Sequence, residues 1–392
     1  MKRSFSSGRR VWGLVASGAG LIAATYGLVR LAYGLFLPDV QAELSFSAAT
    51  AGLISSGASV VYCLGAIAGF LVATRHPRIL VVAAGLSASL GAAGMAASPN
   101  TGSFATFAIV GSAGAGLASP ALVSIVGRNV SAGDNDRSQA RVNAGTGPGL
   151  VAAGVLALIL LPSWRLAWFA VAAFTLLVAA AVLLLDRAGR PAASADVNRA
   201  VLPPGAWFRA HRSIILAALA LGAGSAAVWN YGRTLLVDAG AGEQSSVTAW
   251  IALGLGGTAV IGTAPLMSAV LPRTAWTITT LAVAAASATL GLVPNATVVA
   301  LLACAVFGWG YTAGTGALIA WTTDLDAARA PAGTSLLFVI LIFGQALGAT
   351  AIGLLASSLG FLVAFLAASA LALIATAIPL AAGRHGDPVT TT

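Results

Sequence analysis

Long apolar runs alternate with short polar segments along nearly the whole chain. About 20 apolar residues are enough to cross a bilayer as an α-helix, and Pro, Gly, Asn and charged residues divide the sequence into runs of that length. The runs are 11–37, 46–74, 79–98, 104–127, 142–161, 166–185, 214–237, 247–271, 275–293, 297–320, 335–356 and 361–382. This pattern predicts an all-α polytopic membrane protein with twelve transmembrane helices.

The composition agrees with a chain embedded in lipid. The protein has 392 residues, of which 58% are hydrophobic and 8% are charged, and its mean hydropathy is +0.94. No water-soluble domain could cover its surface with so few polar residues. The net charge of +9 would suit a nucleic-acid partner only if the basic residues shared one folded face. We expect them in loops, and therefore expect a lipid bilayer and no nucleic acid as the surroundings.

The basic residues also predict the orientation. Of the 20 Lys and Arg, 17 fall in the tails or in the loops of one side, and the opposite side receives Arg165 alone. Cytoplasmic loops carry the excess of Lys and Arg in inner-membrane proteins. We therefore expect a multi-pass protein of the plasma (inner) membrane with both termini in the cytoplasm. The run 11–37 is too long for a signal-peptide core, so it is expected to be the first retained span.

A polar, Pro-containing segment separates six runs from six. The predicted organisation is a tail (1–10), a six-helix half (11–186), a cytoplasmic linker (187–212), a second six-helix half (213–383) and a tail (384–392). The halves share short similarities: Gly114–Ala115–Gly116 with Gly314–Thr315–Gly316, and residues 163–169 with 358–365. Parallel six-helix repeats place a substrate path between the halves of a transporter, near the middle of the bilayer.

Several local motifs accompany this organisation. Residues 145–149 read GTGPG, similar to a Gly-Pro antiporter motif, and residues 69–78 read GFLVATRHPR, with Ala73 where the pattern GxxxDRxGRR has Asp. Over residues 11–382 the chain resembles the major facilitator superfamily of transporters. The stretches 27–38, 164–168 and 344–348 resemble its YbfB-like and CynX-like branches. The resemblance implies transport by alternating access, with Gly147, Pro148 and Gly149 in gating and helix packing.

Two arginines lie inside apolar runs, Arg30 in the first and Arg233 in the seventh. An arginine in hydrocarbon costs about 2.5 kcal/mol or more, so it persists where it faces water, a partner or a ligand. On a helix, Tyr26 and Tyr33 would flank Arg30. Trp229 and Asn230 would lie one turn before Arg233. A guanidinium offers a planar fork of donors that suits carboxylate, phosphate or sulfate, so these residues predict a small anionic substrate.

The positions of the two arginines leave different alternatives open. Arg30 lies eight residues before Pro38, about 12 Å along a helix, which is too far for its side chain to reach the surface easily. Arg233 lies five residues before Asp238, about 7.5 Å, so it could reach outward and pair with that carboxylate instead of binding substrate. Either arginine could also have a purely structural role and donate hydrogen bonds to the carbonyls at a helix C-terminus.

Other polar or small residues in the runs are candidates with two interpretations. Gln345 could contact substrate or form an interhelical hydrogen bond. Trp309 and Tyr311 could stack on a ligand or simply pack. Gly114 and Gly116 favour close approach and sliding of helices rather than substrate contact.

The sequence offers no catalytic chemistry. His76, His211 and His385 are expected in loops or tails, and no nucleophile, metal cluster or phosphate-binding loop accompanies them, so we expect no enzyme and no cofactor. No Asp or Glu lies well inside a run, which disfavours a buried carboxylate relay. The leading expectation is a monomeric secondary carrier for a small organic or inorganic anion, working by exchange or proton symport. The alternatives are an exporter of hydrophobic or drug-like compounds and a non-transporting membrane protein.

Overall fold

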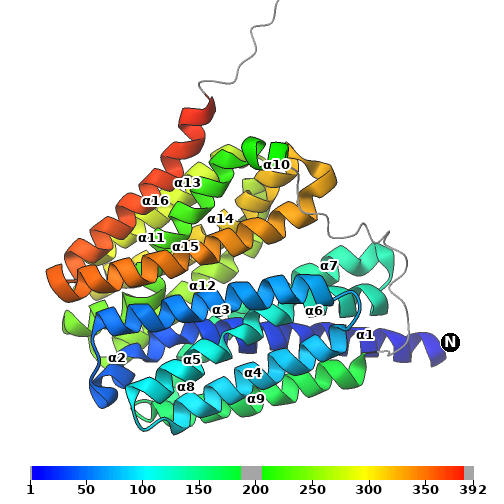
Figure 1. Cartoon of the computed structure of the whole chain (residues 1–392), viewed down its shortest axis with the longest axis horizontal. Coiled ribbons are helices and arrows are strands. Elements are labelled where there is room, and N and C mark those ends of the chain that lie inside the picture. Colours follow the sequence, from blue (N-terminus) through cyan, green and yellow to red (C-terminus); the bar gives the residue numbers. More distant parts are fainter. Residues whose placement is uncertain (1, 187–204, 384–392) are drawn as a thin grey trace, which may run out of the picture. The chain divides into compact units, whose positions relative to one another are not determined.

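In the computed structural model, twelve segments are helices long and apolar enough to cross a membrane, and they coincide with the twelve predicted runs (Figure 1). The structure describes residues 2–186 and 205–383, and these contain no strand. The predicted tail 384–392 and most of the predicted linker lie outside the described residues. The prediction of an all-α, twelve-span protein is confirmed.

The chain divides into two compact units, Met1–Ser47 with Gly57–Ala200 and Ala48–Ser56 with Val201–Thr392. Ala48–Ser56, which the sequence placed in the N-terminal half, groups with the second unit. Hydrogen bonds explain this grouping, because the Tyr231 hydroxyl donates to the Ala48 carbonyl at 3.0 Å and Ser56 Oγ lies 2.6 Å from Thr350 Oγ1.

Nine α-helices and one π-helix supply the first six spans. They are α1 (Lys2–Ile22), η1 (Ala23–Leu31), α2 (Ala32–Leu44), α3 (Ala48–Val72), α4 (Pro77–Ala97), α5 (Thr101–Gly111), α6 (Ala113–Asn129), α7 (Ala132–Asn143), α8 (Thr146–Leu160) and α9 (Trp164–Leu185). The first span is built from α1, η1 and α2, and the fourth from α5 and α6. Within the first unit, α4 packs most extensively on α9 and α6, and η1 packs on α8.

The predicted loop after the fourth span is largely helical. Residues 132–143 form α7, so Arg137 and Arg141 lie on a helix rather than in a loop. Asp134 lies in its first turn, where a carboxylate interacts favourably with the helix dipole, and it accepts a hydrogen bond from Ser131 Oγ at 2.9 Å. The sequence reading failed here because α7 is polar and has no apolar stripe to reveal it.

The second unit contains the remaining helices. They are α10 (Gly205–Ala210), α11 (Arg212–Asp238), α12 (Glu243–Ser268), α13 (Pro272–Leu292), α14 (Thr297–Leu325), η2 (Ala327–Arg329), α15 (Ala330–Leu359) and α16 (Phe361–Gly383). α11 packs on α15 and α16, and α14 packs on α12 and α13 (Figure 1). α15 ends at Leu359, and the φ of 85° at the following Gly360 allows the sharp reversal into α16.

The last residues of the predicted linker are structured. Residues 205–210 form α10, and His211, expected in an exposed loop, is 1% exposed. Its ring stacks on Trp207 at 3.7 Å, and its Nδ1 lies 2.9 Å from the Trp207 carbonyl. Burial lowers the pKa of His211, against the opposing effect of that carbonyl. The imidazole is therefore a neutral packing group rather than a surface charge.

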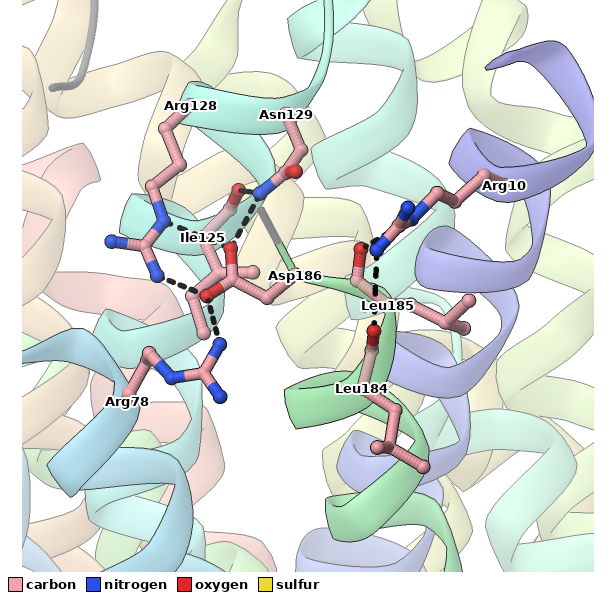
Figure 2. A network of polar contacts seen from close by, with 8 residues as sticks. All are labelled: Arg10, Arg78, Ile125, Arg128, Asn129, Leu184, Leu185 and Asp186. Atoms are coloured by element: carbon pink, nitrogen blue, oxygen red, sulfur yellow. Dashed lines mark hydrogen bonds and ion pairs between the residues drawn. The ribbon is translucent and has the colours of Figure 1, made fainter. Parts of the chain in front are cut away.

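Asp186, directly after α9, is the centre of a polar network in the first unit (Figure 2). Its carboxylate is fully buried and accepts hydrogen bonds from Arg78 at 3.0 Å, from Arg128 Nε at 2.9 Å and from Asn129 at 2.7 Å. Arg128 Nη2 forms a second, short contact with the same carboxylate. The network joins the start of α4, the end of α6 and the end of α9.

Two further contacts secure the same end of the unit. Arg10 donates to the last carbonyls of α9, those of Leu184 at 3.4 Å and Leu185 at 3.2 Å (Figure 2). Cationic side chains at a helix C-terminus satisfy carbonyls that have no partner inside the helix. α1 is thereby attached to α9 beside the Asp186 network.

The network sets the ionisation of Asp186. Burial alone would raise the pKa of this carboxyl, but the hydrogen bonds from Arg128 and Asn129, with the positive charge of Arg128, outweigh burial and hold the pKa below its ordinary value. A carboxyl whose pKa is lower in the folded protein stabilises the fold above the pKa of the unfolded chain and loses that effect at lower pH.

We expect Asp186→Asn to lower the free energy of unfolding by about 3 kcal/mol at pH 7, because it leaves the largely buried Arg128 guanidinium, 13% exposed, without its counter-charge. Thermal unfolding of the purified protein in a mild detergent measures the change. Asp324→Asn is the matched control, since Asp324 is an exposed acid near the end of α14.

The same pair of variants gives a pH test. The difference between the parent protein and Asp186→Asn should be constant from pH 7 to about pH 5. It should shrink below about pH 4, where the carboxyl of the unfolded chain takes up a proton before that of the folded protein does. A difference that persists unchanged at pH 3, or an equal effect of Asp324→Asn, would contradict a role for the ionised carboxylate.

Candidate functional site

Arg30 lies on η1, inside the first span, with its side chain half-buried. Its Nη2 donates to Ser59 Oγ of α3 at 3.3 Å, and its guanidinium carbon lies 4.8 Å from the centre of the Tyr62 ring. An arginine above an aromatic face gains a cation–π attraction that is larger when water is excluded. α3 therefore supplies two groups that fix the direction of the guanidinium.

Tyr26, predicted beside Arg30, joins the same cluster. Its hydroxyl lies 2.7 Å from the Tyr62 hydroxyl, and the two rings meet edge to face with centres 5.6 Å apart. Tyr26, Arg30, Ser59 and Tyr62 thus form one group, which we call the Arg30 cluster. It combines a cation with three hydroxyls that can each donate or accept a hydrogen bond.

Tyr33 lies elsewhere. Its ring packs against Phe104 of α5, with centres 6.3 Å apart, and the residue is 8% exposed. The predicted stripe of Tyr26, Arg30 and Tyr33 assumed a continuous α-helix, but the chain is π-helical up to Leu31. A π-helix has more residues per turn than an α-helix, so the register of Tyr26 relative to Tyr33 differs from that of a continuous α-helix.

The π-helix itself marks this part of the first span. It covers nine residues, Ala23–Leu31, and Arg30 lies in its last turn. π-Helical turns are rare within α-helices and occur frequently at functional sites. The sequence contained no signal for it.

Arg233 is 3% exposed on α11, and its Nε donates to Ser246 Oγ at 3.2 Å. Ser246, in the first turn of α12, donates in turn to the Glu243 carbonyl at 2.9 Å. Within the described part of the chain, Asp238 forms no ion pair with Arg233. Five helical residues separate the two by about 140° around the axis, which directs their side chains apart.

Asn230 and Trp229, one turn before Arg233, have different surroundings. Asn230 Oδ1 accepts a hydrogen bond from Ser55 Oγ at 2.6 Å, and its amide nitrogen donates to the Ala226 carbonyl at 2.8 Å. Trp229 meets an aromatic cluster edge to face: the ring centres of Trp250, Phe307 and Tyr311 lie 6.1, 5.5 and 5.3 Å away. The indole nitrogens of Trp229 and Trp250 are buried and have no hydrogen-bond partner among the described residues.

Gln345 connects to this aromatic cluster. Its side-chain nitrogen donates to the Tyr311 hydroxyl at 2.9 Å and to Ser225 Oγ at 3.3 Å, and the residue is 5% exposed. These are interhelical hydrogen bonds, between α15 and α14 and between α15 and α11. Tyr311 also lies stacked on Phe307, at 6.1 Å and an interplanar angle of 12°.

Trp309 points away from Tyr311. Its indole nitrogen donates to Thr263 Oγ1 of α12 at 2.8 Å. Two helical residues differ by about 200° around the axis, so Trp309 and Tyr311 occupy opposite faces of α14. Of the predicted residues in the second unit, the structure brings Trp229, Tyr311 and Gln345 together and separates Trp309 from them.

Gly145 and Gly149 of the fifth span face the first span. A Cβ on Gly149 would lie 2.7 Å from the Ala23 carbonyl oxygen, and one on Gly27 would lie 2.7 Å from the Gly149 carbonyl carbon. α8 and η1 therefore touch backbone to backbone. Gly147 is half-buried and Pro148 is exposed.

Gly114 and Gly116 face two different neighbours of α6. A Cβ on Gly114 would lie 2.7 Å from the Ala84 carbonyl oxygen of α4, and one on Gly116 would lie 2.7 Å from the Ala66 nitrogen of α3. Their counterparts in the second unit are less crowded: Gly314 faces Thr279 of α13 at 3.4 Å, and Gly316 has no neighbour within 4 Å.

Sequence reasoning missed Ser59 and Tyr62, and also Trp250 and Phe307. A weak signal for α3 exists, because Ser55, Ser59 and Tyr62 follow at intervals of four and three and so share a helix face in an otherwise apolar run. No such signal exists for Trp250 or Phe307, whose importance comes from packing between helices far apart in sequence.

With the twelve-span fold and these sites described, comparison with known proteins decides the family. Residues 19–330 match the model of the Major Facilitator Superfamily. The chain belongs to this superfamily. Membership supports a multi-pass secondary transporter that acts on a small molecule, which confirms the coarse part of the sequence prediction. No curated protein sequence matches the chain.

Solved structures share the fold at low identity. The nucleoside transporter NupG is 14% identical with a TM-score of 0.79, covering 96% of this chain and 100% of its own. A bacterial homolog of the human lysosomal transporter Spinster is 18% identical with a TM-score of 0.72 (96% and 97%), and a D-xylose-proton symporter is 14% identical with a TM-score of 0.73 (94% and 96%). At identities this low, the structural similarity shows the fold alone.

We expect Gly149→Ala to lower the free energy of unfolding by about 2 kcal/mol, since the added methyl group would meet the backbone of η1, which cannot shift without moving the helix. Gly262→Ala is the control: Gly262 lies within α12 and has open space around it, so this change should be neutral or stabilise the helix by about 0.5–1 kcal/mol. Thermal unfolding in detergent measures both, and equal shifts would contradict close α8–η1 packing as the cause.

Proposed function

We propose that the protein is a secondary active transporter that moves a small organic or inorganic anion across the inner membrane by alternating access. The observation that carries the proposal is Arg30, a half-buried cation within a membrane span, positioned by Ser59 and Tyr62. An arginine at such a depth is costly and is retained mainly at substrate or ion pathways. Its charge favours an anion over a neutral or cationic cargo.

The Arg30 cluster has the chemistry to bind an anion with a fixed orientation. A guanidinium donates two parallel hydrogen bonds to a carboxylate, phosphate or sulfate. The neighbouring hydroxyls of Tyr26, Ser59 and Tyr62 can donate to the remaining oxygens. The π-helical segment would present Arg30 and Tyr26 to the ligand together.

Arg233 is proposed as an assisting cation. It is more deeply buried than Arg30 and is fixed by Ser246. Arg233 and Asp238 point in directions about 140° apart around α11, which disfavours the alternative in which this carboxylate is its partner. Trp229, Asn230, Tyr311 and Gln345 are proposed to line the same pathway, and the hydrogen bonds of Gln345 equally suit a structural role.

The coupling is proposed to be anion exchange or symport with a proton carried by the substrate. Eight described acids lie near helix ends: Asp39, Glu43, Asp134, Asp186, Asp238, Glu243, Asp324 and Asp326. A carboxylate relay through the middle of the membrane therefore has no support. Both termini in the cytoplasm and a monomeric state remain part of the proposal.

The fold does not select the cargo. The solved structures of the same fold are described as transporters of nucleosides, peptides or D-xylose. The anion is proposed from the charge of Arg30 alone.

We expect Arg30→Gln to abolish anion transport, with at least a hundredfold lower rate, because Gln cannot replace a charge-assisted bidentate contact. Purified protein is first screened for thermal stabilisation by phosphate, sulfate, and mono- and dicarboxylates. The anion that stabilises it most is then used for exchange in proteoliposomes. Arg30→Lys should retain part of the activity, since it keeps the charge but loses the fork.

Arg209→Gln removes an exposed cation outside the spans and is the control. Normal exchange by a folded Arg30→Gln protein would overturn the proposal. The second candidate is an exporter of hydrophobic compounds, favoured by the Gly-Pro motif whose Gly149 packs on η1. Drug resistance that survives Arg30→Gln combined with Arg233→Gln would favour the exporter.

A further inference from the structure

A cavity of about 420 Å³ lies in the first unit between α1 and α7. It is separate from the Arg30 cluster and is used by no part of the proposed transport mechanism. Its size falls within the range of about 300–1,000 Å³ that is usual for small-molecule sites. One wall is apolar, formed by Val11, Trp12 and Val15 of α1. The opposite wall is polar and carries Arg137 and Arg141 of α7 together with Ser131 and Ser138.

The two arginines form a pair of like charges. Arg137 and Arg141 are one turn apart on α7 and therefore neighbours on one face, where like charges repel. The Arg141 guanidinium carbon lies 4.6 Å from the centre of the Trp12 ring, which holds that charge at the cavity. Within the described part of the chain neither arginine forms an ion pair. An anion bound between them would relieve the repulsion.

The other charge at the cavity limits which anion fits. Asp134 also lines it and accepts the hydrogen bond from Ser131. With Arg137 and Arg141 at +2 and Asp134 at −1, the formal charge of the lining is +1. The single negative charge of a phosphodiester balances this lining charge. A phosphate dianion would leave one negative charge unbalanced, which the Asp134 carboxylate would repel.

The apolar wall indicates a ligand with a hydrocarbon part. Trp12 is 60% exposed, and it lies two residues after Arg10, where the first candidate span begins. Tryptophan at a span end is typical of the membrane–water interface, and basic pockets between helices at this level suit anionic lipid headgroups. Inorganic phosphate has no apolar part that could contact the valine and tryptophan side chains.

We propose that this α1–α7 cavity binds the phosphodiester headgroup of an anionic phospholipid such as phosphatidylglycerol. Arg137 and Arg141 donate to the phosphate, and Ser131 and Ser138 lie within the same wall to bond the glycerol portion. Trp12, Val11 and Val15 contact the start of the acyl chains. The lipid bridges α7 to α1, the helix that Arg10 ties to α9, and so stabilises this end of the first unit.

The test measures lipid binding to the purified full-length protein by native mass spectrometry during titration with phosphatidylglycerol or phosphatidylcholine. The parent protein should retain phosphatidylglycerol in preference to phosphatidylcholine. The double variant Arg137→Gln/Arg141→Gln should bind phosphatidylglycerol about tenfold more weakly, since each basic residue near the membrane surface contributes to attraction of anionic lipid. Arg75→Gln/Arg209→Gln removes two exposed cations outside the cavity and should leave binding within about twofold of the parent.

Two further measurements separate the alternatives. Arg137→Lys/Arg141→Lys should keep most of the preference for phosphatidylglycerol, since it keeps both charges. Thermal unfolding of Arg137→Gln/Arg141→Gln close to that of the parent shows that its loss of binding is not unfolding. Inorganic phosphate at millimolar concentration should not displace the lipid. Displacement would contradict the proposal of a lipid ligand and would indicate a site for soluble phosphate. Equal loss in the Arg75/Arg209 control, or no preference for phosphatidylglycerol in the parent, would overturn the cavity as an anion site.

Discussion

The structure depends on one constraint: in hydrocarbon, no water is present to satisfy the backbone N–H and C=O groups. Each span must form these hydrogen bonds within itself, so the twelve apolar runs are helices. Lipid also removes most of the hydrophobic drive for helices to associate, and close packing replaces it. Gly27 and Gly149 show how this works, because the backbones of η1 and α8 approach to a distance that leaves no room for a Cβ.

The lack of water in hydrocarbon also restricts where charged residues can lie. Most charged residues lie at helix ends, where they are solvated or paired, and Asp186 shows the paired case. Its buried carboxylate is tolerated because Arg78, Arg128 and Asn129 surround it with donors, and the network in turn joins three helices. Arg30 lies within a span instead, and Ser59 and Tyr62 set the direction of its side chain. A cation at such a depth is costly, which is why Arg30 carries the proposed function.

The candidate site could be predicted only in part. Arg30 and Arg233 were identifiable because a charge inside an apolar run is visible in the sequence. Tyr26 was correctly placed beside Arg30, since neighbours one turn apart follow from helix geometry. The contact of Tyr33 with Phe104 could not be predicted, because it joins side chains of two helices far apart in sequence. Trp309 and Tyr311 looked alike by composition, yet they lie on opposite faces of α14.

The sequence by itself determined the number of spans, the class of fold and the two intramembrane arginines. These depend on local hydrophobicity and on the cost of a charge in lipid, which are properties of each segment alone. Only the tertiary structure decided that Tyr62 and Ser59 orient Arg30, that Gln345 bonds Tyr311, that α7 is a helix facing Trp12, and that Arg78, Arg128 and Asn129 meet around Asp186. These contacts join residues tens to hundreds of positions apart, and their formation depends on how helices pack rather than on any pattern within one run.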